Sequence, residues 1–240
     1  MFNYRVAGMN VMASHRAALS TDGAADGWVT IRFSQQAECL ADDIPVPGGP
    51  NLCVVARDGK EARISGVKDE LDWRAVQIRR VLPFAAALQG HLTLHACGLV
   101  LKDCAVAVVG ESGVGKSTLA RFLIAHWVVA ADDLLPCRFR VGKPVVPLVD
   151  RDVRLGHICF MERDLGAERP RLVPLDPPEV MQNLLRHGFG ELRQQAIWSF
   201  QFDRYGVLSK SVPGHRLTVP DDLCKLPDTE TLLRELVQAS

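Results

Sequence analysis

The sequence lacks an excess of charge of either sign. Its 240 residues include 28 lysines and arginines and 28 aspartates and glutamates, so the formal net charge is zero. A neutral chain has no global positive field to attract nucleic acid, and no run of basic residues suggests a membrane surface. We therefore expect neither nucleic acid nor a membrane as a partner, and any charged ligand must be held by local groups.

A long apolar run is also missing. No stretch reaches the roughly 18 residues that a membrane-spanning helix needs, and the opening MFNYRVAGMNVMASHRAALS lacks the basic and apolar regions of a signal peptide. These absences predict a cytoplasmic location. With 48% apolar and 23% charged residues, the composition is typical of a folded globular protein rather than a disordered one.

Paired cysteine spacings do not occur either. The seven cysteines stand singly without a C-x-x-C pair, which gives no sign of a zinc cage or a redox dithiol. Apart from His95, the six other histidines show no H-x-x-x-H spacing among themselves, so they do not indicate a metal site of their own. We expect the cysteines to be reduced thiols, mostly buried as small apolar residues.

Regular β and α patterns are present from end to end. The first 70 residues contain an alternating run at 28–33 and a hairpin signal at Asp58-Gly59, and they predict a small β-rich lobe. Helical spacing follows from Asp69 to Gly90, with a bend expected at Pro83. The length allows one good-sized α/β core with a smaller appended lobe, so we expect a division into residues 1–70 and 71–240.

The middle of the chain predicts a strand, a loop, a helix and another strand. Two β runs surround Lys102-Asp103, and the second, AVAVVG, is apolar on both faces, as a central strand should be. A helix is expected from Lys116, and VVAA at 128–131 predicts a buried strand that ends in two aspartates. Beyond Pro144 the pattern predicts strands, two helices broken near Gly188, and a last strand in HRLTVP.

The loop between the first strand and the helix carries the strongest motif. Gly110, Gly115, Lys116 and Ser117 satisfy G-x-x-x-x-G-K-[ST] in the strand-to-helix context that this motif requires. The glycines let consecutive backbone N–H groups point at a phosphate, and the positive end of the helix adds to the attraction. The alternative is a glycine-rich turn that binds nothing.

The motif assigns a nucleotide-binding role to nine consecutive residues. Lys116 would carry its charge to the β- and γ-phosphates of a nucleotide, and the Ser117 hydroxyl would ligate Mg²⁺; the motif leaves open whether the donor is ATP, GTP or pyrophosphate. The residues expected to bind the nucleotide are Gly110, Glu111, Ser112, Gly113, Val114, Gly115, Lys116, Ser117 and Thr118.

Three further residues are candidates for the chemistry. Asp132 and Asp133 follow an apolar run, where a carboxylate can hold Mg²⁺ or take a proton from an attacking hydroxyl. A solvated pair capping the turn before Leu134 is the alternative, which the preceding WVVAA disfavours. His95 precedes an apolar strand, and its pattern alone favours a core histidine bonded to a backbone carbonyl.

Residues 92–133, LTLHACGLVLKDCAVAVVGESGVGKSTLARFLIAHWVVAADD, resemble the catalytic core of HPr kinase/phosphorylase and its HPr kinase-related relatives. Members of that family carry a histidine followed by a small residue, two strands, a loop written G-[DPE]-S-G-x-G-K-S and an Asp-Asp pair. His95 stands at the family's distance ahead of Gly110, and the Asp pair falls within one residue of its usual place. The resemblance implies an α/β fold with a P-loop core and a mixed sheet, shared with phosphoenolpyruvate carboxykinases, and makes 71–240 the nucleotide-binding catalytic domain.

The resemblance also implies a role for each matching residue. Asp133 would be the general base that takes the proton from a serine or threonine hydroxyl, and His95 would help to position the phosphate or the base. Lys116 would stabilise charge on the transferred phosphoryl group. Ser117, with Asp132 or Asp152, would hold Mg²⁺.

Outside this core the resemblance is weaker. The segments PRLVPLDPPEVMQNLLRHGF and SVPGHRLTVPDDLCKLP are similar to the kinase-related branch, which includes members encoded beside peptide-modification enzymes. The first 70 residues do not resemble the family's regulatory domain, and its Glu-Ile-Arg-Gly-Leu-Gly signature is matched only by DVRLGHI at 152–158. Recognition of HPr itself and the reverse phosphorolysis are therefore left open.

The expected function is an ATP-dependent kinase acting on a Ser or Thr hydroxyl of a protein or peptide, such as a peptide natural-product precursor. A kinase of a small hydroxy-metabolite and a nucleotide-binding regulator without catalysis are the alternatives. The full-length enzymes of the family form homo-oligomers, so self-assembly is a further expectation.

Overall fold

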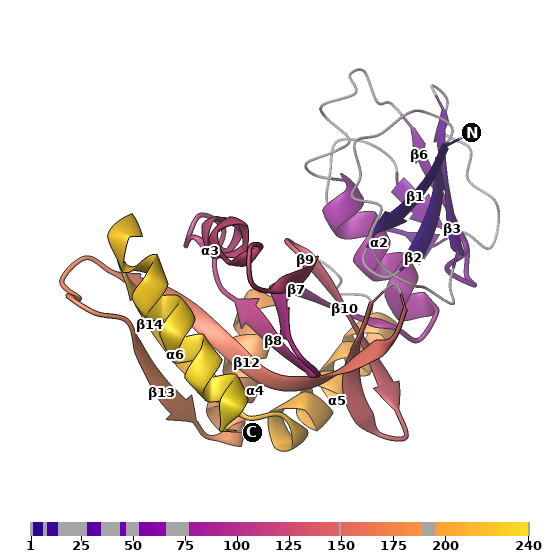
Figure 1. Cartoon of the computed structure of the whole chain (residues 1–240). Coiled ribbons are helices and arrows are strands. Elements are labelled where there is room, and N and C mark those ends of the chain that lie inside the picture. The colour runs from indigo at the N-terminus through magenta and orange to yellow at the C-terminus, as the bar shows by residue number, and fades with distance from the viewer. Residues whose placement is uncertain are drawn as a thin grey trace. The chain divides into compact units, whose positions relative to one another are not determined.

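The computed structural model describes residues 2–6, 9–13, 28–34, 44–46, 53–65, 77–148, 150–188 and 195–239 (Figure 1). The chain forms two compact units. The first comprises Met1–Thr93, Pro147–Arg151 and Phe189–Phe202, and the second comprises Leu94–Val146, Asp152–Gly188 and Asp203–Ser240. The domain boundary expected at residue 70 stays a prediction. Within the described ranges, no helix is both long and apolar enough to cross a bilayer.

In its described residues, the first unit holds a six-stranded mixed sheet, the helix α2 (Gln77–Leu88) and the beginning of α5 (Gln195–Ser211). Across the sheet, the strands are β1 (Phe2–Val6), β2 (Met9–Ala13), β3 (Trp28–Ser34), β6 (Glu61–Ser65), β5 (Cys53–Val55) and β4 (Ile44–Pro45). The β-rich character expected of this region is confirmed. The helix α2 includes Pro83; the part of the expected helix before Gln77 lies outside the described residues.

A hairpin joins β5 to β6 at the Asp58-Gly59 signal. The backbone of Gly59 has φ +72°, which favours glycine, and a Cβ there would lie 2.5 Å from the carbonyl oxygen of Ala85 in α2. The Gln89 side chain donates to the Gly59 carbonyl at 2.8 Å. The hairpin therefore packs directly on the end of α2, and this close approach requires a residue without a side chain.

The second unit is built on an eight-stranded mixed sheet. Its strands are, in order, β11 (Lys143–Pro147), β10 (Leu134–Arg140), β7 (Leu92–Leu101), β8 (Cys104–Val109), β12 (Asp152–Asp164), β14 (Gly214–Pro220) and β13 (Arg171–Leu175), with β9 (Val128–Ala131) paired to β7. β8, β12 and β14 run parallel to one another. Their carboxyl ends therefore meet at one edge of the sheet, which is where α/β proteins usually bind ligands.

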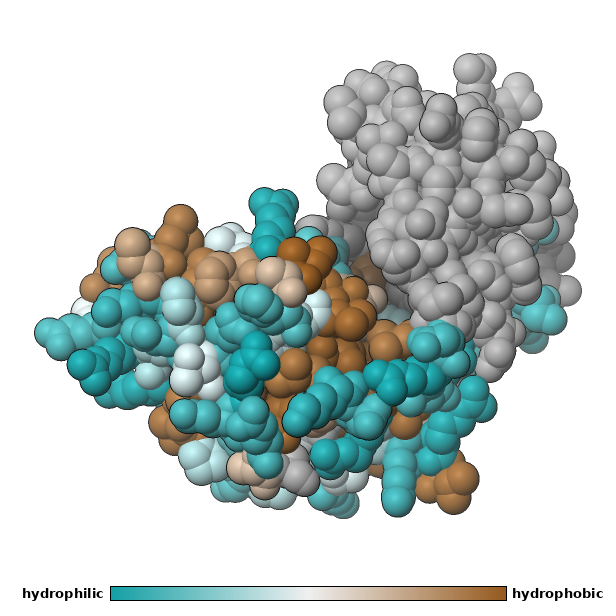
Figure 2. Space-filling view, in the orientation of Figure 1, coloured by the Kyte–Doolittle hydropathy of each residue, from teal (hydrophilic) through white to brown (hydrophobic). Residues whose placement is uncertain are grey.

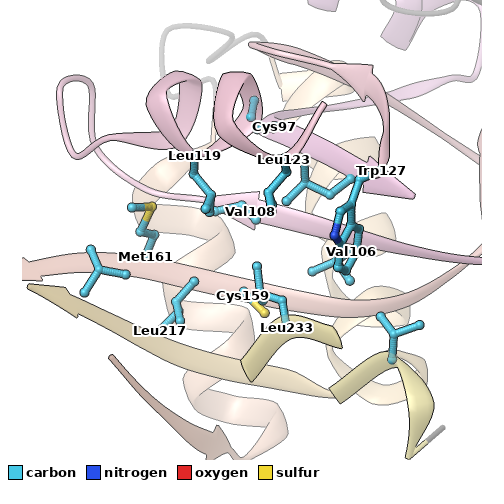
Figure 3. Close-up of a cluster of buried hydrophobic side chains, with 14 of the residues drawn as sticks. Cys97, Val106, Val108, Leu119, Leu123, Trp127, Cys159, Met161, Leu217 and Leu233 are labelled. Carbon is cyan, nitrogen blue, oxygen red and sulfur yellow. The ribbon is translucent and has the colours of Figure 1, made fainter. Parts of the chain in front are cut away.

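One face of this sheet is covered by α3 (Lys116–Leu123) and α6 (Leu226–Gln238) (Figure 3). Leu119 and Leu123 are four residues apart, so both point from one side of α3 toward Val108 of β8. Leu233 of α6 and Trp127 belong to the same buried cluster. Each such leucine contributes about 1.5–3 kcal/mol by leaving water.

The helix α4 (Pro177–His187) packs on the opposite face at the same edge. Its start is well defined, since Asp176 accepts from the Glu179 backbone N–H while the Glu179 side chain accepts from the Asp176 N–H. Phe160 points away from α3, and its ring stacks on that of His187 with centroids 6.4 Å apart. The predicted break near Gly188 is confirmed, and α5 follows at Gln195–Ser211.

Three details differ from the sequence expectations. The strand β9 was expected to be buried, but Val128 is 56% exposed and the other three residues are half-buried. Val128 is one of several exposed apolar residues, and Figure 2 shows apolar residues beside hydrophilic ones on one face of the molecule. The strand β13 and the C-terminal helix α6 were not anticipated, although Pro227 near the start of α6 and its spaced leucines are helix signals.

A pair of histidines links two of the parallel strands. The Nδ1 atom of His157 in β12 lies 3.2 Å from Nε2 of His215 in β14, so one ring N–H donates to the other ring. Burial, with a smaller contribution from the nearby His215 and Arg154, lowers the pKa of His157 to about 4. Burial also lowers the pKa of His215, so both rings are neutral near pH 7.

Replacing a buried leucine of α6 tests the packing on the sheet. We expect Leu233→Ala to lower the free energy of unfolding by about 2–5 kcal/mol, because it leaves a cavity beneath the helix. Leu165→Ala is the control, since Leu165 is 83% exposed, and should change stability by less than about 0.5 kcal/mol. Urea unfolding followed by circular dichroism measures both; equal losses would contradict this packing.

The histidine pair predicts a pH dependence of stability. The pKa of His157 is about 4 in the folded chain, below its ordinary 6.5, so between these values the unfolded chain binds a proton that the folded chain does not. Stability should therefore fall as the pH drops from 6.5 toward 4. In His157→Gln this slope should become shallower, whereas His126→Gln, at an exposed position, should keep it. Urea unfolding midpoints measured across this pH range test the prediction. An unchanged slope in His157→Gln would contradict the role of His157 in the pH dependence of stability.

Candidate functional site

The glycine-rich loop lies at the carboxyl edge of the parallel strands, between β8 and α3. A Cβ on Gly110 would lie 2.7 Å from the carbonyl oxygen of Met161 in β12, so the loop leaves the sheet in close contact with the neighbouring strand. Gly115 has φ +110° and ψ 9° immediately before α3, a conformation that side chains disfavour. These two positions require glycine for different reasons, close packing at Gly110 and backbone angle at Gly115.

Lys116 is the first residue of α3 and is buried, with 6% of its surface exposed. Its Nζ donates to the carbonyl oxygens of Gly110 at 2.7 Å and Glu111 at 2.9 Å, so the ammonium group lies across the beginning of the loop. Ser117 is half-buried and Thr118 is exposed on the first turn of α3. Buried ammonium groups are costly unless they are bonded in this way.

His95 and Asp133 meet beside the loop. β7 is antiparallel to β8 and β9 is antiparallel to β7, so the residues that follow β9 return to the edge where the loop begins. The Nε2 atom of His95 lies 3.2 Å from Oδ1 of Asp133, and the Ala96 N–H donates to the Asp133 carbonyl at 3.2 Å. Since Ala96 pairs with Val109, His95 lies next to the start of the loop.

The exposed Asp132 and the buried Lys116 both lie within electrostatic reach of Cys97 in β7. Burial raises the pKa of the Cys97 thiol to about 12, with the carboxylate of Asp132 contributing to the increase and the ammonium of Lys116 opposing it. Both charges therefore act on one buried atom of β7. The structure thus brings Lys116, His95 and the Asp pair to one edge of the sheet.

Asp152 does not belong to this group, and the expectation that it could hold Mg²⁺ with Ser117 is wrong. Two residues beyond it, Arg154 pairs with Cys104 at the beginning of β8. Asp152 therefore lies about 20 Å from the loop edge, the length of a six-residue strand. Its Oδ2 accepts from Nε of Arg140 at 2.9 Å, which gives it a structural ion pair instead.

Two cavities adjoin the loop. The larger has a volume of about 440 Å³ and extends from Glu111–Val114 to the end of β12 and to α4. The smaller has a volume of about 290 Å³ and lies beside Thr118, where the η1 turn (Leu223–Lys225) and the start of α6 form its other wall. The loop therefore separates two spaces of the size that small ligands occupy.

Five residues of the larger cavity were not anticipated from the sequence. Asn183, Arg186 and His187 face it because they are three and four residues apart on α4, and Arg163 and Arg216 come from β12 and β14. Burial lowers the pKa of His187, with Arg186, Lys116 and His95 contributing and Glu111 opposing. The helical spacing in NLLRH would have placed the three α4 residues on one side of a helix. It would not have shown that this side lines a cavity beside the loop.

Two of these arginines, Arg163 and Arg186, contact the loop from the side of this cavity. Arg163 donates to the carbonyl oxygens of Val114 at 3.3 Å and Gly113 at 3.5 Å, and it pairs with Asp221 at 2.8 Å. Arg186 pairs with Glu111 at 3.0 Å. The first half of the loop is thus held by cations from two other elements.

Comparison with known proteins gives structural likeness but no match to a family model or to a curated protein. Among solved structures, the Hpr(Ser) kinase/phosphatase from Coxiella burnetii matches with a TM-score of 0.37 and 14% identity, over 61% of this chain and 97% of that protein. At this level the likeness establishes neither family nor function. The mixed α/β fold itself is evident from the two sheets described above.

The glycine before α3 provides a test of the loop geometry. We expect Gly115→Ala to cost about 1–2 kcal/mol, because an L side chain disfavours the left-handed backbone that it would have to adopt. Gly166→Ala is the control, because a Cβ there would make only an ordinary contact, 3.5 Å from Oδ1 of Asp164. Urea midpoints compare the two, and a loss no larger in Gly115→Ala than in Gly166→Ala would contradict the loop conformation.

Proposed function

We propose that this protein is an ATP-dependent kinase that transfers the γ-phosphate to a Ser or Thr hydroxyl of a protein or peptide. One observation carries the proposal. The His95–Asp133 pair, with atoms 3.2 Å apart, lies at the same sheet edge as a glycine-rich loop whose lysine is buried against it. Phosphoryl transfer requires mainly a phosphate cradle, positive charge and a base, and this edge contains candidates for all three.

In this proposal the loop from Gly110 to Thr118 holds the phosphates of ATP. Its backbone N–H groups and the first turn of α3 supply donors and positive potential, and Lys116 supplies a charge. The smaller, mostly apolar cavity beside Thr118 would take the nucleoside. A P-loop core of the HPr kinase and phosphoenolpyruvate carboxykinase type is the corresponding fold assignment.

Mg²⁺ would be held by oxygen atoms from this edge. Ser117 offers a hydroxyl at the start of α3, and Asp132 offers an exposed carboxylate. Such ligands fit Mg²⁺, which commonly takes one or two protein oxygens and completes its shell with phosphates and water. When bound, the ion would neutralise charge on the phosphates.

The proposed transfer uses Asp133 as the base. Its carboxylate takes the proton of the acceptor hydroxyl, the acceptor oxygen forms a bond to the γ-phosphorus, and the bond from that phosphorus to the β-γ bridging oxygen breaks to leave ADP. His95 orients the Asp133 carboxylate through their contact, and Lys116 stabilises negative charge on the transferred group. A kinase of a small hydroxy-metabolite is the second candidate, because the 440 Å³ cavity is in the size range of small-molecule sites.

Removing the base tests the proposal. We expect Asp133→Asn to lower phosphate transfer from labelled ATP by about 10²–10⁴-fold, because the amide cannot take the proton. Binding of ATP and Mg²⁺, measured by calorimetry, should change little. Asp203→Asn, at an exposed position on α5, is the matched control and should keep the full rate.

The acceptors in this test are serine and threonine peptides and a panel of hydroxy-metabolites. Transfer by Asp133→Asn at the wild-type rate would contradict its role as the base. ATP binding without transfer to any acceptor would contradict the kinase and favour a nucleotide-binding regulator.

A further inference from the structure

The larger cavity beside the loop is rich in arginine. Arg163, Arg186 and Arg216 line it from β12, α4 and β14, whereas the carboxylates in its lining are Glu111 and Glu162. The three arginines are between 40% and 69% exposed, so their guanidinium groups reach solvent. Three elements that are distant in sequence thus each contribute a guanidinium group to the larger cavity.

The neighbouring carboxylates do not saturate these arginines. Each guanidinium has five N–H donors, and one carboxylate engages two of them at most. Arg216 lies 4.0 Å from Glu179, whose carboxylate already accepts from the Asp176 N–H at the start of α4. Glu162 accepts from the Thr218 hydroxyl at 2.8 Å. Donors therefore remain for an anion in the cavity.

The other polar groups of the cavity bring no further charge. His187 is held neutral at pH 7, since burial and the adjacent cations lower its pKa, and Asn183 is an amide. Both can donate and accept hydrogen bonds. Ser112 adds a neutral hydroxyl to the lining, and a cavity that combines three guanidinium groups with three neutral polar side chains suits a ligand that is both anionic and hydroxylated.

This cavity also adjoins the proposed transfer groups. It begins at Glu111–Val114, and His187 is near enough to Lys116 and His95 for both to affect its ionisation. The smaller cavity opens instead at the Thr118 end of the loop. A molecule in the larger cavity would therefore lie next to the transferred phosphoryl group, on the side away from the nucleoside.

We propose that the larger cavity is the acceptor site and that the acceptor carries a carboxylate or phosphate group close to its hydroxyl, contacted by Arg186 and Arg216. This inference rests on the kinase function proposed above and names the chemical class of its substrate. A serine or threonine flanked by acidic residues has this chemistry, and a small hydroxy acid or sugar phosphate shares it. Arg163 acts mainly on the loop, to which it already donates.

Peptide binding to the full chain tests the inference without requiring catalysis. The probes are fluorescein-labelled peptides of equal length with one serine flanked by glutamates, glutamines or lysines, in the presence of Mg²⁺ and a non-hydrolysable ATP analogue. Fluorescence anisotropy should show the glutamate peptide binding about tenfold more tightly than the glutamine peptide, and the lysine peptide more weakly than both. Hydroxy acids and sugar phosphates added as competitors distinguish a small acceptor from a peptide.

Arginine variants identify the groups responsible. Arg186→Gln and Arg216→Gln should each remove most of the preference for glutamate, while Arg216→Lys should retain part of it because the charge remains. Arg169→Gln, at an exposed position between β12 and β13, is the matched control and should change nothing. Urea midpoints establish that each variant is folded, and labelled ATP measures transfer to the same peptides.

Each outcome decides one of the two proposals. Equal binding of the glutamate and glutamine peptides, or an equal loss in Arg169→Gln, would overturn the acceptor site. So would variants of Arg186 and Arg216 that weaken binding of the ATP analogue alone, since the arginines would then serve the nucleotide. A preference for glutamate that depends on both arginines, without transfer to any acceptor, would support the anion site and contradict the kinase.

Discussion

The parallel pairing of β8 with β12 is the constraint on which the rest of the site depends. Its register places Val109 beside Phe160, so the loop leaves the sheet where Met161 presents its carbonyl oxygen to Gly110. A side chain larger than hydrogen at Gly110 would push the strands apart. The same pairing brings Arg163 to the loop carbonyls and opens a cavity toward α4.

The charges at this edge are arranged around the loop rather than inside it. Lys116 is buried but bonded to two carbonyl oxygens, which reduces the cost of keeping an ammonium group away from water. His95 and Asp133 hold each other on one side, while Arg163 and Arg186 approach from the other. In the proposed kinase, a phosphate at the loop would lie near these cations and a carboxylate, which are the groups that phosphoryl transfer requires.

Local features of the fold and of the site could be predicted from the sequence because they depend on residues that are neighbours in the chain. The Asp58-Gly59 hairpin and the β8–α3 loop were both predicted from glycines at positions where the backbone turns sharply. Burial was less predictable, since the apolar VVAA run became the partly exposed β9. The choice of Asp152 as the alternative to Asp132 for a metal ligand was wrong because strand register, which local patterns do not encode, places it at the far end of β12.

By itself the sequence determined the loop, the helix that follows it and the three candidate residues His95, Asp132 and Asp133, because turn chemistry and strand and helix periodicity act over a few residues. Only the tertiary structure decided that His95 contacts Asp133 and that arginines line the space next to the loop. Arg186 and Glu111, for example, are 75 residues apart and meet only because α4 packs against the sheet at that edge. Contacts of this kind depend on the whole fold, so no short pattern in the chain predicts them.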